Sequence, residues 1–391
     1  MRIAMLIVLL AAGGFRFVDS PTDRVEGGPP IEIRMDGRAA DGMEARIAVI
    51  REKFPELRRH RTTRFEILSD LPADEVAGHG TLLERTAHAV EAFREALGID
   101  WGVGDRDRQL VVAFASQDDF VRFAAGFDQM NARWLAGYFS PRHGHLAYHD
   151  AHDHPGVRRA ASRHHLDVVA RDDVARDDVA GVDEFEDDPR LAGLRRFVAR
   201  TNASVVVHEA THMLLHRRDI LAATVDTPLW LAEGLAGSFE PVDPARKFGP
   251  TRPSNGRTAE FRDLLADGSI PSVRSMLTTD TMPDAREVNA FYASSATLCS
   301  WLVRHRPDGM RRYLERMPRR LGDEVRVASV DSEAGDPDAA SIFDLGTGRA
   351  VDPRIARFES AFGDVDELEH DWLAWERAVQ DTTISTVVEQ D

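Results

Sequence analysis

The feature that most restricts the fold of this 391-residue sequence is an apolar stretch at residues 205–215 that carries two histidines and a glutamate. These are His208, Glu209 and His212, in the spacing His-Glu-x-x-His, and most of their neighbours are Val, Ala, Met or Leu. Residues four apart lie one turn above each other on one face of an α-helix, so both imidazoles can reach one metal ion while Glu209 flanks it. Burying such groups is unfavourable unless they have partners, and a metal ion is such a partner. The stretch therefore predicts a buried, metal-binding helix.

A catalytic zinc site needs a third protein ligand and keeps its fourth position for water. The candidates that follow the motif are His216, Asp226 and Glu233. Three histidines in an i, i+4, i+8 stripe cannot converge on one tetrahedral ion, so we expect His216 to be structural.

Glu233 is the better candidate because it is the only carboxylate in a second apolar helix, predicted at residues 229–239 after a loop that ends in Pro228. We expect Gly234 to let this helix approach the first one closely. The alternative is that Glu233 only complements the dipole at the helix N-terminus.

The segment His208-Glu209-x-x-His212, followed by the Trp-Leu-Ala-Glu-Gly-Leu-Ala sequence at residues 230–236, resembles the motif pair of the gluzincin zinc peptidases. It is most similar to the aminopeptidase-N-like and the uncharacterised bacterial peptidase-MA-like domains. The resemblance covers about residues 61–376, less the insertions, and implies that His208, His212 and Glu233 bind Zn²⁺ and that Glu209 is the general base. The Gly-Ala-Met-Glu-Asn motif of aminopeptidases does not occur in the sequence, so exopeptidase activity does not carry over.

The resemblance implies roles for two further residues. Tyr292 lies in a segment, residues 291–298, that is similar to the tyrosine-bearing helix of the peptidase-MA-like group, and is expected to hydrogen-bond the oxyanion. The alternatives are that Tyr292 only packs in the core, or that His305 takes this role. Glu240 falls seven residues after Glu233, where aminopeptidase-like members tend to carry Glu, and is expected either to support a ligand or to be a solvated carboxylate.

We therefore expect a zinc-dependent metallopeptidase with a peptide or protein substrate and Glu209 as the general base. The alternative is a non-catalytic secreted binding or scaffold protein with a structural or vestigial zinc site, whose fourth ligand would be His216 or a histidine between residues 143 and 165. A third hypothesis keeps the zinc chemistry but assigns it to another kind of amide bond.

The amino-acid composition indicates which classes of binding partner and which kinds of metal site the chain can have. The 49 Lys and Arg residues against 66 Asp and Glu give a net charge of −17, which argues against nucleic acid or an anionic membrane as the partner. The single cysteine, Cys299, excludes an intrachain disulfide and a cysteine-based zinc cluster. Seven of the 15 histidines lie between residues 143 and 165, in what we interpret as a polar insertion rather than a metal site.

The N-terminus predicts export. Arg2 precedes an apolar run at residues 3–12 that is too short to span a membrane but suits a signal-peptide core, with a small-residue cleavage site at residues 11–13. We expect a periplasmic, extracellular or N-terminally anchored protein that contacts a membrane only through this segment if it is not cleaved. The alternative is a buried strand or a wrongly assigned start, with a cytoplasmic location.

The hydrophobic pattern predicts an α+β fold, in which a small N-terminal α/β layer packs on a mostly helical, zincin-like catalytic domain. Strands are expected at residues 64–68 and 109–114, and a hairpin at 136–140 and 145–148, whose residues 137–139 could pair with an extended substrate. Helices are expected at residues 82–97, 118–125, 205–215, 229–239, 288–303 and 365–379. The expected division of the chain is 1–18 signal peptide or anchor, 19–60 linker, 61–150 N-terminal α/β subdomain, 151–190 polar insertion, 191–317 helical zinc-binding catalytic subdomain, 318–350 loop insertion, 351–380 C-terminal helix and 381–391 tail.

Overall fold

The computed structural model of the chain describes residues 42–100, 108–153, 189–221, 227–253, 255–284, 287–317 and 352–388. The proposed signal peptide, the tandem repeat of the polar insertion and the loop at 318–350 lie outside the described residues. In chain order, the elements are α1 (Met43–Lys53), β1 (Arg58–Arg61), β2 (Phe65–Ser69), α2 (Ala73–Ala96), β3 (Gln109–Phe114), α3 (Gln117–Phe123), the π-turn η1 (Ala124–Asp128), β4 (Gly137–Ser140), β5 (His145–His149), the 3₁₀ turn η2 (Ala151–Asp153), α5 (Pro189–Arg217), α6 (Leu229–Phe239), α7 (Thr258–Asp267), α8 (Val273–Thr278), α9 (Val288–His305), α10 (Pro307–Glu315), α11 (Pro353–Phe362) and α12 (Val365–Val388).

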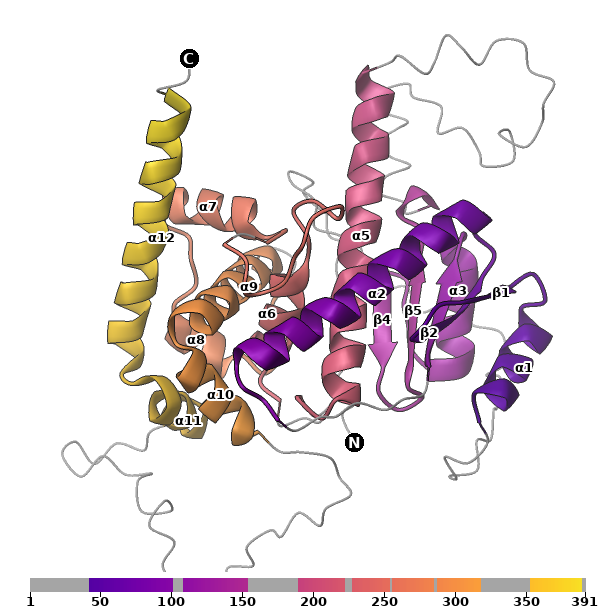
Figure 1. The fold of residues 1–391 in the computed structure, drawn as a ribbon, viewed down its shortest axis with the longest axis horizontal. Coiled ribbons are helices and arrows are strands. Elements are labelled where there is room, and N and C mark those ends of the chain that lie inside the picture. The colour runs from indigo at the N-terminus through magenta and orange to yellow at the C-terminus, as the bar shows by residue number, and fades with distance from the viewer. Residues whose placement is uncertain are drawn as a thin grey trace, which may run out of the picture.

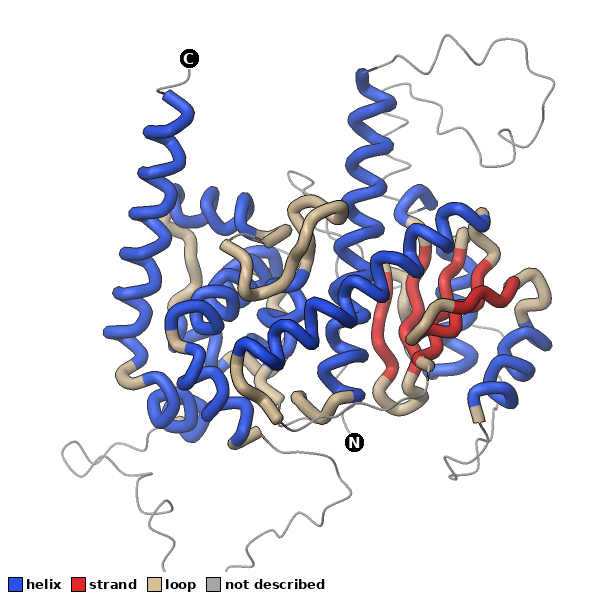
Figure 2. Tube along the Cα trace, in the orientation of Figure 1, coloured by secondary structure: helices blue, strands red, loops and turns tan. Residues whose placement is uncertain are grey.

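The strands form one mixed sheet in the order β1-β2-β3-β5-β4 (Figures 1 and 2). The pairs β2–β3 and β3–β5 are parallel, and β1 and β4 are added antiparallel at the two ends. The β4–β5 pair is the predicted hairpin, in which Tyr138 lies opposite Ala147. The combination of this sheet with a larger set of helices confirms the predicted α+β fold.

Both faces of the sheet are covered, which explains why its central strands are apolar without alternation. One face, which includes Val111 and Leu146, packs against α2 and α5, and the opposite face, which includes Val112 and Ala147, packs against α1 and α3. The layer order places α5 directly against the sheet, beside the edge strand β4.

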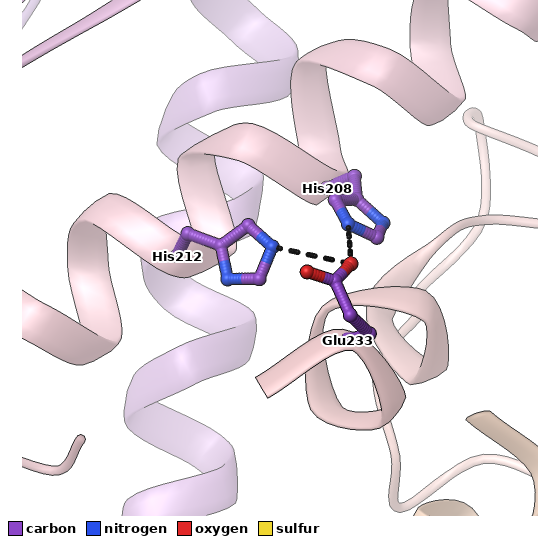
Figure 3. A group of neighbouring side chains, drawn as sticks. All are labelled: His208, His212 and Glu233. Atoms are coloured by element: carbon purple, nitrogen blue, oxygen red, sulfur yellow. Dashed lines mark hydrogen bonds and ion pairs between the residues drawn. The ribbon is translucent and has the colours of Figure 1, made fainter. Parts of the chain in front are cut away.

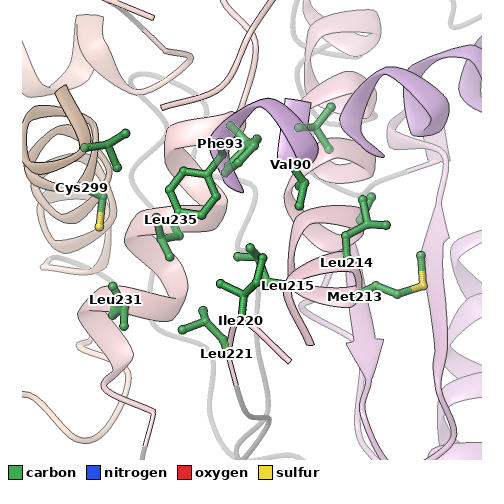
Figure 4. Close-up of a cluster of buried hydrophobic side chains, with 14 of the residues drawn as sticks. Val90, Phe93, Met213, Leu214, Leu215, Ile220, Leu221, Leu231, Leu235 and Cys299 are labelled. Atoms are coloured by element: carbon green, nitrogen blue, oxygen red, sulfur yellow. The ribbon is translucent and has the colours of Figure 1, made fainter. Parts of the chain in front are cut away.

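The other side of α2 and α5 packs against the helices of the C-terminal half, and α6 makes the main contact with α5 there (Figure 1). Buried side chains from α2, α5, α6 and α9 meet in this interface (Figure 4). The α6 helix is buried over nearly its whole length, because it lies between α5 and α9. Within the described ranges, no helix combines the length and the apolarity needed to cross a bilayer.

Several boundaries differ from the sequence-based prediction, and the largest difference is that α5 begins at Pro189, 16 residues before the predicted start at residue 205. The expected linker at 19–60 contains α1, whose Ile47 and Ile50 are buried against the sheet, and the start of β1. The α2 helix begins nine residues before the predicted start at residue 82, because its exposed first turns lack apolar periodicity. The α12 helix continues beyond the expected end at residue 380, to Val388.

Gly234 also has a different neighbour from the one expected. A Cβ atom at this position would lie 2.6 Å from the backbone oxygen of Ser295, so the close approach that Gly234 permits is between α6 and α9 rather than between α6 and α5. The prediction from sequence was wrong because a glycine indicates a close helix contact without identifying the partner helix, and the nearest atoms at Gly234 belong to α9. A third helix, which the motif does not reveal, completes the packing.

Candidate metal centre

The two histidines of the His-Glu-x-x-His motif lie in the second half of α5, where the helix is enclosed between the sheet and α6. His208 is fully buried, and His212 is 5% exposed. Their rings lie 4.8 Å apart between centroids, as the i, i+4 spacing predicts.

Glu233 extends from α6 toward both imidazoles (Figure 3). Its Oε2 atom lies 3.1 Å from Nε2 of His208 and 3.8 Å from Nε2 of His212. One ligand atom from each of the three residues lies within 4.8 Å of the others, which is close enough to hold one metal ion. The structure thus brings together the three residues predicted as ligands, whereas Asp226 lies outside the described residues.

Glu209 is fully buried beside this group and faces β4. Burial raises the pKa of Glu209 to about 8, although the neighbouring His208 charge and the backbone amide of Phe139 lower it. Among the described residues, no donor makes a hydrogen bond of normal geometry to either oxygen of this carboxylate. A buried carboxylate in this condition is suited to exchange a proton with a molecule that enters the site.

Glu240, at the C-terminal end of α6, supports the other side of the His208 ring. Its Oε1 atom accepts hydrogen bonds from Nδ1 of His208, at 2.9 Å, and from Nε and Nη2 of Arg257, at 3.1 and 2.9 Å. Burial alone would raise the pKa of Glu240, but Arg257 and His208 hold it at about 2. The carboxylate is therefore ionised and 2% exposed, so it supports His208 and is not a solvated helix-end group.

His208 consequently lies between two carboxylates. Burial alone would lower the pKa of His208, but its hydrogen bonds to Glu233 and Glu240 raise it to about 9. His212 has no such support, and burial followed by the charge of His208 lowers its pKa well below the ordinary value. The two imidazoles differ because Nδ1 of His208 donates a hydrogen bond to Glu240, whereas no described carboxylate supports His212 in this way.

The donor set fits a divalent transition metal. Imidazole nitrogens with one carboxylate oxygen are a common ligand set of catalytic Zn²⁺, and the same set also binds Fe²⁺. Nε2 of His212 is buried and makes no hydrogen bond to any described residue, as expected of an atom whose partner is an ion. Glu240 supplies the support behind a ligand histidine that metal sites usually have.

Tyr292 of α9 lies beside the group, with its ring centroid 5.9 Å from that of His208. Burial and the hydrogen bond to Glu233 raise the pKa of its hydroxyl well above the ordinary value, so Tyr292 keeps its proton. His305, the alternative oxyanion donor, and His216, the alternative metal ligand, have other ring neighbours. His305 is exposed and packs between Trp301 and Trp375, and the ring of His216 packs 5.4 Å from that of Phe139.

The described histidines that precede the polar insertion do not join the group. His143 and His145 bind the buried Asp128 at 2.7 and 2.9 Å, and this carboxylate also accepts hydrogen bonds from Tyr138 and Ser140. Asp128 thereby fastens η1 to the β4–β5 hairpin. Within the described ranges, the metal-binding group contains no fourth histidine, cysteine or carboxylate.

Sequence patterns did not identify Arg257. It lies in the loop before α7, outside any apolar periodicity, and only the Asn255-Gly256 pair before it marks a turn. Its position follows from hydrogen bonds of that turn: Gly256 donates its backbone N–H to the carbonyl of Glu240, and Asn255 donates to Ser300 of α9.

Comparison with known proteins gives one family match. A family model described as "Protein of unknown function (DUF1570)" matches residues 202–322, a range that includes His208, His212, Glu233 and Tyr292. No curated protein matches the chain. The match shows similarity to an uncharacterised family over the part of the chain that forms the candidate metal centre.

Proposed function

We propose that the protein is a zinc-dependent metallopeptidase of the gluzincin type. The observation that carries this proposal is the convergence of His208, His212 and Glu233 next to Glu209, a buried carboxylate without a hydrogen bond of normal geometry to any described residue. A site that only stabilised the fold would have no use for such a base.

In this proposal, Nε2 of His208, Nε2 of His212 and the Glu233 carboxylate hold the ion. When bound, Zn²⁺ would supply Lewis acidity, which makes water a stronger acid and stabilises negative charge on a carbonyl oxygen. Glu240 and Arg257 keep the His208 ring oriented, with Nδ1 donating to Oε1 of Glu240.

The residues of the chain supply the proton transfers. An oxygen of Glu209 takes a proton from the water that attacks the peptide carbonyl, and it then delivers this proton to the leaving amine nitrogen. The carboxylate is fully buried and has no hydrogen bond of normal geometry to any described residue, so both oxygens are open to these proton transfers. Tyr292 keeps its hydroxyl proton, which it shares with Glu233 in the structure, and in this proposal it donates that proton's hydrogen bond to the developing oxyanion instead.

The position of β4 supports a peptide as the substrate. This strand lies at the end of the described strand order, beside α5, and the amide of its Phe139 faces Glu209. An extended peptide that paired with such an edge would pass its backbone carbonyls close to Glu209.

The alternative, a closed structural zinc site in a binding or scaffold protein, needs a fourth side-chain ligand. The described residues contribute only three ligands, and His216 and His143 have other neighbours. Export of the protein remains a prediction that rests on residues 1–18.

The test is a comparison of wild type with Glu209→Gln on a peptide library, with new termini identified by mass spectrometry. Glu209→Gln keeps the shape and all three ligands, so we expect metal content to be unchanged and the cleavage rate to fall about 10²- to 10⁴-fold. The exposed Glu95→Gln is the matched control and should cleave as wild type does. Equal cleavage by wild type and Glu209→Gln would refute the proposed role of this residue, and absence of cleavage by the metal-loaded wild type would refute the peptidase.

A further inference from the structure

The side chain of Arg257 is only 10% exposed, although this residue belongs to no predicted motif. It directs two nitrogens to one oxygen of Glu240, at 3.1 and 2.9 Å, and its Cζ atom lies 5.4 Å from the centre of the Tyr292 ring. One side chain thus contacts both the carboxylate that supports a ligand and the proposed oxyanion donor. It also faces Glu260, which is partly exposed, at 3.7 Å.

Burial of charge explains why a guanidinium is needed at this place. Glu209, Glu233 and Glu240 are three carboxylates that are each at most 2% exposed. In the proposed site Glu233 would face a divalent ion, and Arg257 supplies the positive charge next to Glu240. A buried carboxylate without a partner is strongly unfavourable, so without the two contacts from Arg257 the Glu240 carboxylate would not be held in its position beside His208.

The orientation of Glu240 matters because it determines which nitrogen of His208 faces Glu233. While Oε1 of Glu240 accepts the Nδ1 proton, Nε2 points to Oε2 of Glu233 at 3.1 Å. Hydrogen bonds of this kind fix the tautomer and the ring orientation of metal-ligating histidines. Ser204, one turn before His208, holds the second oxygen of Glu240 at 3.0 Å.

The loop that carries Arg257 is itself fixed. Oδ1 of Asn255 accepts the backbone N–H of Arg257 at 2.9 Å, and Nδ2 of Asn255 donates to Oγ of Ser300 in α9 at 3.0 Å. The guanidinium therefore has a defined position relative to α6 and α9.

We propose that Arg257 is a positioning residue of the metal centre, which acts through Glu240 to hold the His208 imidazole in its ligating orientation. This inference rests on the proposed metal site and adds to it a residue outside both motifs. It predicts that metal affinity and ligand geometry depend on Arg257, although Arg257 is not itself a ligand.

The experiment is a titration of the metal-free full-length protein with Co²⁺, whose visible absorption reports ligand geometry, with affinity measured against a chelator. Arg257→Ala and Glu240→Gln should each weaken Co²⁺ binding about 10- to 100-fold and change the spectrum. Because both act through the same contact, the double variant should be no weaker than the weaker single variant. Arg257→Lys, which keeps the charge but not the two-nitrogen contact, should recover part of the loss.

The matched control is Arg304→Ala, because Arg304 is another arginine that lies over an aromatic ring, with its Cζ atom 4.7 Å from the centre of the Trp375 ring, although it is only half-buried. The Co²⁺ affinity and the absorption spectrum of Arg304→Ala should equal those of wild type. Wild-type affinity and spectrum in Arg257→Ala, or losses that multiply in the double variant, would overturn the inference while leaving the metal site intact. If Arg257→Ala does not fold, Arg257→Gln is held to the same criteria. Absence of Co²⁺ binding by wild type would instead overturn the metal site itself.

Discussion

Replacing Gly234 with alanine tests whether the contact between α6 and α9 sets the position of the third ligand. The added Cβ atom would lie 2.6 Å from the backbone oxygen of Ser295, about 0.8 Å inside the 3.4 Å at which ordinary contact begins, and 2.7 Å from Sγ of Cys299. The sulfur can rotate away, but the backbone of α9 cannot, so α6 must shift. Overpacking of this kind destabilises a fold by about 1–3 kcal/mol. The shift also carries Glu233, the adjacent residue, away from His208 and His212.

The free energy of unfolding is measured by urea denaturation, followed by circular dichroism, and metal affinity is measured by chelator competition. We expect Gly234→Ala to lower both. The matched control is Gly78→Ala in α2, where an added Cβ atom meets nothing within 4 Å and the variant should gain about 0.5–1 kcal/mol from helix propensity. Wild-type stability together with wild-type metal affinity in Gly234→Ala would refute the proposed α6–α9 packing.

Two further predictions concern groups outside the metal centre. Burial raises the pKa of Glu376 to about 7, against the partial opposition of Arg304. Because this pKa lies above the ordinary value of 4.5, the folded state favours the neutral form of Glu376. The contribution of this group to the free energy of unfolding is full below about pH 4.5 and is lost as the pH rises through 7. The total loss is about 3 kcal/mol. Glu376→Gln should therefore lose less stability than wild type between pH 5 and pH 8 in urea denaturation, and equal losses would contradict this. Asp128→Asn places an amide among donors that need an acceptor, so it should lower the free energy of unfolding by about 1–3 kcal/mol. The control Asp118→Asn changes an exposed residue and should leave this free energy unchanged. Equal stabilities of the two variants would show that the hairpin does not depend on Asp128.

The parts of the fold that follow from local pattern were predicted from the sequence. The apolar run at residues 109–114 is β3, the turn at residues 141–144 closes the β4–β5 hairpin, and the two apolar helices carry their polar residues on facing sides. The i, i+4 relation of His208 and His212 is a property of any α-helix, so their common direction required no tertiary information.

Features that depend on contacts distant in sequence could not be predicted in this way. The strand order places β5 between β3 and β4, which no single segment specifies. Gly234 identifies a close helix contact but not its partner, which is α9. Arg257 has no periodic neighbours, and its role emerges only when the turn at Asn255 brings it beside Glu240.

The most direct test of the central claim is the metal content of the purified full-length protein, measured by inductively coupled plasma mass spectrometry. It is compared with a variant that combines His208→Ala and Glu233→Ala, which removes two of the three ligands. The account predicts about one zinc per wild-type chain and none in the variant. Absence of metal in the wild type after reconstitution, or retention of zinc by the variant, would contradict it.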